Sequence, residues 1–261
     1  MLRHPALWVC AALQIVLTFI VTVKYATTPV LSTALSDIFC MEETFFGFAL
    51  IEIMSYVMCT LIVGGDYSNK TIRNKIILGY TREQIFFAQF LTALTATLVV
   101  YVLRLLFFCA FSLPVLKTFD LRREYLLAVF VITLFSLVMY SSFVTFMLSL
   151  TQSKTKTLVI CIACFLIVMF LFATLIPRNY DEAKYAAHSI ISKTDYAFND
   201  WSEGKNGDFY KFMYEFFPSG QSQLIYQQAP LCLWQIILYL GLQIAAFLTG
   251  GALIFRFRNI K

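Results

Sequence analysis

Long apolar runs alternate with short polar stretches along this chain. A run of about 20 apolar residues is what a hydrocarbon core roughly 30 Å thick requires. The runs are apolar on every face and too long for membrane strands, so they predict helices rather than a barrel. We expect spans near residues 6–25, 44–64, 83–111, 125–150, 158–176 and 231–255. The pattern predicts an all-α integral membrane protein whose six spans form a single transmembrane domain over residues 1–261.

Composition agrees with a membrane protein. Of 261 residues, 60% are hydrophobic and only 13% are charged, unlike an ordinary soluble domain. The first run follows Arg3 but is long and lacks a convincing small-residue cleavage site, so we expect a membrane helix there rather than a secretory signal. The net charge of +5 does not indicate nucleic-acid binding, because the basic residues lie between spans instead of on one soluble face.

The distribution of Lys and Arg predicts the orientation, because cytoplasmic loops carry the excess of these residues. One set of segments holds Arg3, Lys70, Arg73, Lys75, Arg82, Lys154, Lys156, Arg256, Arg258 and Lys261, opposed only by Asp66 and Glu83. The other set is nearly neutral and holds Asp37, Glu42, Glu43, Asp120 and Glu124. Both termini are therefore expected in the cytoplasm.

The largest segment between spans, residues 177–230, is then extracellular and rich in aromatic residues. Phe209, Phe212, Phe216 and Phe217 lie close together, and the turn signal Pro218-Ser219-Gly220 ends this aromatic stretch. Such a density of aromatics favours a membrane-water boundary, so we expect residues 209 to 217 to form a helix at or dipping into the outer boundary. A small folded cap with an aromatic core is the alternative.

Cysteines do not indicate a metal site. Six of the seven fall inside predicted spans, where they are expected to act as small apolar packing residues. Cys161 and Cys164 form a CxxC, but the sequence has no second pair and no nearby histidine to complete a zinc site.

The segment from residue 64 to 90 carries the most specific signal. It superficially resembles a phosphate-binding loop, because Lys70 and Thr71 follow Gly64 at a suitable spacing. Asn69 stands where a phosphate cradle needs glycine immediately before its lysine, and no soluble region is large enough for a nucleotide-binding domain. We therefore expect this chain to bind no cofactor itself.

The same segment predicts a short helix, a turn and a new helix. Asn69 can cap the short helix, Gly79 is placed to end it, and Thr81 with Gln84 forms a capping box before the third span. From Arg82 to Phe111 the third helix is about 45 Å long, so it should project into the cytoplasm. The exposed face is predicted to carry Ile72, Ile76 and Tyr80 beside Arg73, Lys75 and Arg82. A soluble partner could dock there; a basic amphipathic helix on anionic lipid would use the same charges.

This pattern resembles the permeases of ABC-2 type ABC transporters, particularly the peptide-export and bacteriocin-immunity branch that includes the phenol-soluble-modulin-type exporters. In that family an acidic-aromatic pair closes the second span, and a TIRNK-like helix and a Gly-x-(Ser/Thr)-Arg turn follow. The matching residues are Asp66, Tyr67, Thr71, Ile72, Arg73, Asn74, Lys75, Gly79, Thr81 and Arg82. Lys70 departs from the family, since many relatives have glycine there.

The resemblance implies a type V exporter-like fold in which residues 66–82 form a cytoplasmic coupling segment. It implies a homodimer or a pair of half-transporters, with a separate ABC ATPase subunit on each copy, ATP and Mg²⁺ bound by those partners, and a translocation path between the permeases. The chain itself would be non-catalytic and would export a peptide or another amphipathic substrate across a plasma membrane, expected to be bacterial.

Two intramembrane charges leave other functions open. Glu52 and Arg104 lie about 13 and 15 Å from the outer ends of their helices, so we expect them to pair across adjacent spans. Alternatively, Arg104 extends outward while a protonated Glu52 bonds to a backbone carbonyl. An ion-coupled secondary carrier could use both residues, although no paired repeats or broken spans support it. A membrane-embedded enzyme is the third alternative, but the sequence has no HExxH or GxSxG motif.

Overall fold

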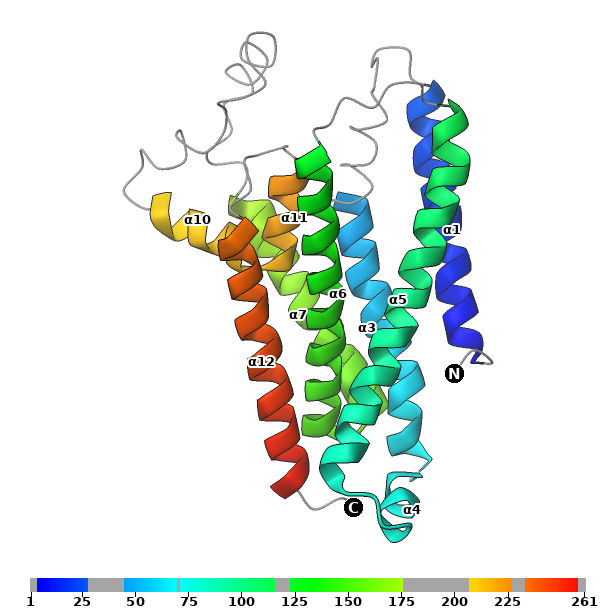
Figure 1. Cartoon of the computed structure of the whole chain (residues 1–261), viewed down its shortest axis with the longest axis vertical. Helices are drawn as coiled ribbons and strands as arrows, with labels where there is room; N and C mark the ends of the chain where they lie inside the picture. The colour runs from blue at the N-terminus through cyan, green and yellow to red at the C-terminus, as the bar shows by residue number, and fades with distance from the viewer. Residues whose placement is uncertain are drawn as a thin grey trace.

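Helices account for every regular element that the computed structural model describes, which covers residues 4–27, 45–69, 71–115, 123–175, 207–226 and 233–257. Figure 1 shows them as one elongated bundle. The helices are α1 (Pro5–Thr27), α3 (Phe45–Ser68), α4 (Thr71–Ile77), α5 (Arg82–Val115), α6 (Arg123–Thr151), α7 (Lys154–Leu175), α10 (Gly207–Phe216), α11 (Pro218–Tyr226) and α12 (Leu233–Phe257).

Four of these helices are long and apolar enough to cross a membrane. Their apolar stretches are Arg82–Phe111, Leu127–Thr151, Lys154–Phe172 and Leu233–Phe257. The described part of the chain is thus all-helical and has the character of a membrane protein, and four of the predicted spans coincide with helices that could cross a membrane. The described apolar part of α1, Pro5–Ile20, is shorter, so the spans expected near residues 6–25 and 44–64 stay predictions.

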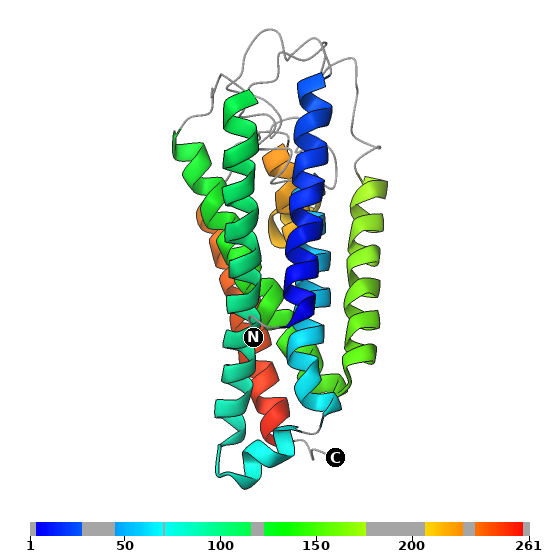
Figure 2. The ribbon, with the colours of Figure 1, turned by 90° about the vertical axis from the view of Figure 1, so that its right-hand side faces the viewer.

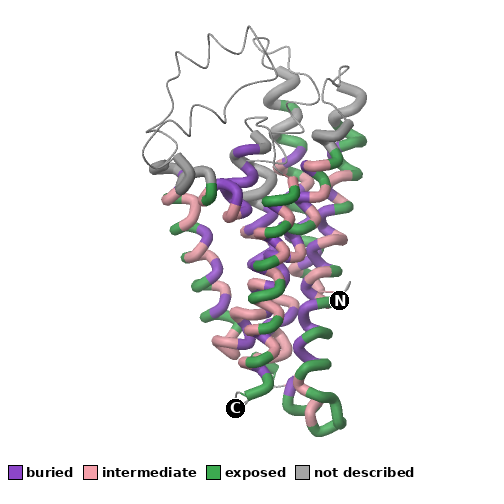
Figure 3. Tube along the Cα trace, turned by 60° about the vertical axis from the view of Figure 1, so that its left-hand side comes forward, coloured by how far each residue is buried: buried purple, intermediate pink, exposed green. Residues whose placement is uncertain are grey.

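Helix α6 occupies the centre of the bundle, with α3, α5, α7 and α12 packed around it (Figures 1 and 2). Just over half of the apolar stretch of α6 is buried, compared with a third or less of each of the other three stretches (Figure 3). The apolar residues exposed on these three helices would face lipid in a membrane. The main core cluster lies along α6 and includes Tyr140, Val144 and Leu148. Cys59 and Cys161 are buried in the same cluster, as expected of apolar packing residues.

Small hydroxyl side chains let neighbouring helices approach α6 closely. Thr133, Ser136, Ser141, Ser142 and Thr145 are all buried, and each bonds to a backbone carbonyl three or four residues earlier. The hydroxyl groups of Ser141 and of Thr97 on α5 also lie 3.2 Å apart. Small residues at helix interfaces and satisfied hydroxyls are what packing in a membrane favours.

The two ends of the bundle differ. At one end α4 lies beyond the ends of α6 and α12, and at the other end α10 and α11 pack against α12, α3 and α7 (Figure 1). Residues 177–206 of the predicted extracellular segment lie outside the described residues, as do Arg3, Lys70 and the acidic residues Asp37, Glu42, Glu43 and Asp120 on which the predicted orientation partly depends.

Candidate functional site

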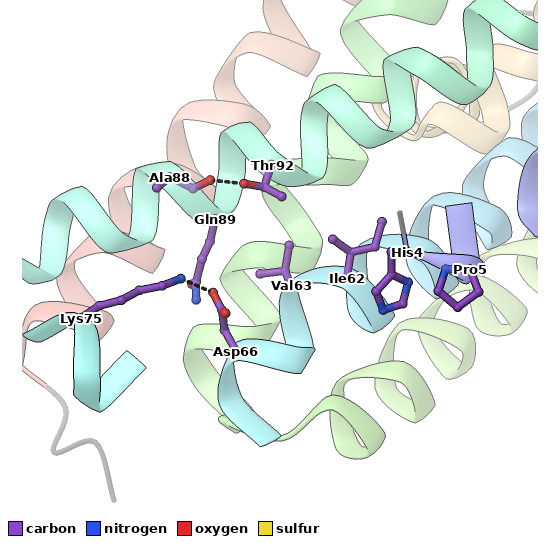
Figure 4. Close-up of a pocket in the computed structure, with 9 residues that line it drawn as sticks. All are labelled: His4, Pro5, Ile62, Val63, Asp66, Lys75, Ala88, Gln89 and Thr92. Carbon is purple, nitrogen blue, oxygen red and sulfur yellow. Dashed lines mark hydrogen bonds and ion pairs between the residues drawn. The ribbon is translucent and has the colours of Figure 1, made fainter. Parts of the chain in front are cut away.

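The short helix α4 is fastened to the end of α3 by one carboxylate. Asp66 Oδ1 accepts a hydrogen bond of 2.8 Å from the Thr71 hydroxyl, and Asp66 Oδ2 forms an ion pair of 2.6 Å with Lys75 Nζ (Figure 4). We call Asp66, Thr71 and Lys75 the Asp66 cluster. A helix of seven residues is too short to be stable alone, so these contacts hold it in place. Asp66 therefore supplies side-chain contacts to α4, and the cap expected from Asn69 stays a prediction.

The predicted end of α4 and start of α5 are confirmed. Gly79 has a φ of 92°, which favours glycine, and its amide donates to the Ile76 carbonyl while the Tyr80 amide donates to the Lys75 carbonyl. The capping box is reciprocal, since the Thr81 amide donates to Gln84 Oε1 and the Gln84 amide donates to Thr81 Oγ1. The chain thus reverses sharply between α4 and α5.

The two faces of α4 differ from the predicted arrangement. Ile72 is 1% exposed and packs with Ile85, Phe86 and Phe255, and Ile76 packs partly against that cluster, so neither forms the outer face. The reason is helical geometry, because residues 72 and 76 share one side and that side meets α5 and α12. The exposed side chains are Arg73, Asn74 and Ile77 on α4 and Leu78 and Tyr80 just after it, and the last three are 75%, 76% and 57% exposed.

Tyr67 joins the Asp66 cluster to α5. Its hydroxyl donates to Gln89 Oε1 at 3.2 Å, and its ring contacts Phe255 of α12. Burial, and then the adjacent Asp66 carboxylate, raise the pKa of the Tyr67 phenol above its ordinary value, while the bond to Gln89 lowers it. The phenol therefore stays a hydrogen-bond donor at neutral pH.

Arg82 connects the start of α5 with the end of α12. Its guanidinium donates to the Arg256 carbonyl at 3.1 Å, and the Arg256 side chain lies 3.4 Å from Glu83 in an exposed ion pair. Exposed pairs contribute little stability, about 0 to 1 kcal/mol. Arg82 therefore helps to place α12 beside α5. The sequence predicted Arg82 on a face that a partner could bind, but its guanidinium already bonds within the chain.

A second polar site surrounds Glu52 inside the bundle. The buried carboxylate accepts a hydrogen bond of 2.7 Å from the Tyr56 hydroxyl and one of 3.2 Å from the Ser219 hydroxyl. Ser219 is the second residue of α11, so the carboxylate lies at the positive end of that helix. Glu52 thus joins α3 to the segment between α7 and α12.

The hydrogen bonds of Glu52 that the structure describes go to Tyr56 and Ser219, and the predicted pairing with Arg104 stays a prediction. Ile51 packs against Tyr101 on α5, and Glu52, one residue and about 100° further round α3, faces the side where α11 lies. Arg104 is buried one turn after Val100, which packs against Leu7 and Met58.

The aromatic segment forms two helices instead of one helix and a terminal turn. Helix α10 is confirmed for most of the predicted range and includes Phe209. Phe212 and Phe216 stack at 5.2 Å and both contact Tyr239 of α12, whereas Phe217 contacts Phe172 of α7. The Pro218-Ser219-Gly220 signal begins α11, because proline fits the first turn of a helix, where its missing N–H costs nothing.

Substituting Gly220 by Ala should loosen the α10–α11 corner. A Cβ at Gly220 would lie 2.7 Å from the backbone of Tyr214, which cannot move without shifting α10. We expect a loss of at least about 1 kcal/mol, measured as a lower apparent Tm of the purified chain. Gly241→Ala is the matched control, because its Cβ would meet nothing within 4 Å. An equal loss in both variants would contradict the close packing at this corner.

Several residues of both sites could not be expected from sequence patterns. Tyr56 follows Glu52 by one helical turn, which could have suggested the hydrogen bond, but Ser219 is 167 positions away. Gln89 is 22 positions from Tyr67, also beyond the reach of a local pattern. Neither a protein-family model nor a curated protein sequence matches this chain. The assignment of a function rests on the two sites and on the membrane-spanning character.

Proposed function

We propose that this chain is the membrane-spanning permease subunit of an ATP-driven exporter of the ABC-2 type. The supporting observation is that α4, held by the Asp66 cluster, and the turn after it expose Arg73, Asn74, Ile77, Leu78 and Tyr80 at one end of the bundle. Large apolar side chains grouped outside the apolar spans are typical of a surface that binds a partner. A short helix fastened to two long ones can also transmit a push from that partner into the membrane.

In this proposal α4 is the coupling helix, and it faces the cytoplasm. Six spans with both termini inside would place residues 177–230 outside, where α10 and α11 lie. Two ABC ATPase subunits would bind ATP and Mg²⁺, and two permease copies would form the path for a peptide or another amphipathic substrate. The proposed location is the plasma membrane of a bacterial cell.

Charge reversal on the exposed face of α4 tests this function. We expect a gene for an ABC ATPase beside the gene of this chain, and its product should copurify with the chain in equal copies. Arg73→Glu should weaken that association about tenfold, because a charged contact at an interface contributes on the order of 1.4 kcal/mol or more. The measurement is binding of the purified ATPase to the detergent-solubilised chain.

Lys156→Glu is the matched control, since Lys156 is an exposed cation at the start of α7 and lies outside α4. Its binding should equal that of the unmodified chain. Loss of binding in both variants, or in neither, would contradict docking on α4. Transport that proceeds in vesicles without any ATPase would instead favour the ion-coupled carrier.

A further inference from the structure

A cavity of about 510 Å³ lies behind the Asp66 cluster, between the start of α1, the end of α3, α4 and the first turns of α5. Its polar lining comes from His4, Asp66, Lys75, Gln89 and Thr92 (Figure 4). The remaining walls are Pro5, Ile62, Val63 and Ala88. This volume is in the range of small-molecule sites, so it can hold a group much larger than a water molecule. The cavity is separate from the exposed face of α4.

Gln89 is the residue that points to a ligand. It is only 4% exposed, its Oε1 accepts from Tyr67, and its Nε2 has no hydrogen-bond partner. Figure 4 shows the amide nitrogen reaching from α5 towards the Asp66–Lys75 pair. A buried donor without an acceptor costs about 1 to 3 kcal/mol, so a ligand that supplies an acceptor oxygen would recover this energy.

Two further lining residues, His4 and Lys75, also offer N–H donors. His4 Nδ1 accepts from the Ala6 amide, which places the ring proton on Nε2. Lys75 has three N–H groups and uses one on Asp66, while both Asp66 oxygens already accept from Thr71 and Lys75. The Thr92 hydroxyl donates to the Ala88 carbonyl. The cavity also adjoins the N-terminus of α1, which favours an anion.

Surfaces beside the cavity are apolar and face outward. Trp8 and Val9 on α1 and Phe87 and Leu91 on α5 are exposed at this end of the bundle. Tryptophan is enriched where the hydrocarbon meets the headgroups of a bilayer. A headgroup could therefore enter the cavity while its acyl chains stay against α1 and α5.

We propose that this cavity binds the phosphoryl group of a phosphate ester, held by Gln89 Nε2, Lys75 Nζ and the His4 ring, and that its source is a membrane phospholipid. A phosphodiester carries one negative charge and several acceptor oxygens. These oxygens can accept from the Gln89 amide, the His4 ring and the N–H groups of Lys75 that do not bond to Asp66. The proposal does not depend on the ATPase partner.

Native mass spectrometry of the full chain in detergent tests the site. With phosphatidylglycerol added, the chain should retain one lipid tightly, and Gln89→Leu should weaken that binding about tenfold, as expected for a lost hydrogen bond to a charged group. Ala88→Phe should have a similar effect by filling the cavity without removing a hydrogen bond. Thr95→Val is the control, because Thr95 lies on the exposed side of α5 and outside the cavity lining.

Glycerol 3-phosphate distinguishes the two sources of the phosphoryl group. If the chain binds phosphatidylglycerol but not glycerol 3-phosphate, and both cavity variants bind the lipid less tightly, the result supports a phospholipid as the ligand. Binding of soluble glycerol 3-phosphate with the same sensitivity assigns the site to a free phosphate ester and overturns the lipid source. Equal retention of phosphatidylglycerol by Gln89→Leu, Ala88→Phe and the unmodified chain would overturn the site itself.

Discussion

Replacing Asp66 by Ala should release α4 from α3 and raise the amide exchange rates of α4 about 30-fold. The substitution removes the hydrogen bond to Thr71 and the ion pair to Lys75 together. The side chains of Lys75 and Asp66 are 40% and 29% exposed, so we take about 2 kcal/mol for the two contacts, which corresponds to about 30-fold in the open population. Hydrogen-deuterium exchange of the purified chain measures this directly.

Glu83→Ala is the control for a lost ion pair at the same end of the bundle. Glu83 pairs with Arg256 at 3.4 Å, but both side chains are more than half exposed. We expect a change of less than about fivefold in exchange anywhere, because exposed pairs contribute at most about 1 kcal/mol. Unchanged protection of α4 in Asp66→Ala would show that Ile72 and its neighbours hold the helix without the Asp66 cluster.

In the proposed exporter, the same variant separates docking from coupling. Arg73, Leu78 and Tyr80 would remain on the chain, so an ATPase could still bind, although α4 would no longer be fastened to α3. Transport per ATP hydrolysed should therefore fall much more than ATPase binding. Arg73→Glu should show the opposite order, with binding lost first.

Sequence alone predicted those features that depend on neighbouring residues. The long apolar runs identified four membrane-crossing helices, and the Gly79 turn and the Thr81–Gln84 capping box were located correctly because each is closed within a few residues. The helix α10 was also expected from its aromatic spacing, although Pro218 was taken to end the aromatic stretch when it begins α11.

The rotation of each helix could not be predicted, and this explains the errors. Helices that are apolar on every side give little periodicity, so sequence does not indicate which face meets a neighbour. In the short helix α4 the problem was different: its apolar side was expected to face a partner, although Ile72 is buried against Phe86 of the same chain. Glu52 was matched with Arg104 by depth alone, and depth gave no indication of its hydrogen bonds to Tyr56 and Ser219.

Replacing Glu52 by Leu should destabilise the chain by about 2 to 4 kcal/mol. Tyr56 and Ser219 are both buried, and each would lose its acceptor, which costs about 1 to 3 kcal/mol per stranded donor. The expected result is a marked fall in apparent Tm and loosening of α11 from α3. Tyr56→Phe removes only one hydroxyl and should cost about 1 kcal/mol.

Two double-mutant cycles decide which partner Glu52 has. In the cycle of Glu52→Leu with Tyr56→Phe, the combined loss should be smaller than the sum by about 1 kcal/mol, because the second substitution removes the donor that the first one strands. In the cycle of Glu52→Leu with Arg104→Leu, the losses should add within about 0.5 kcal/mol, since the described hydrogen bonds of Glu52 go to Tyr56 and Ser219. A larger coupling energy of Glu52 with Arg104 than with Tyr56 would support the ion pair and contradict the hydrogen bond to Tyr56. If Glu52 does pair with Arg104, Glu52→Leu alone leaves the buried arginine without its partner. Adding Arg104→Leu should then restore part of the lost stability.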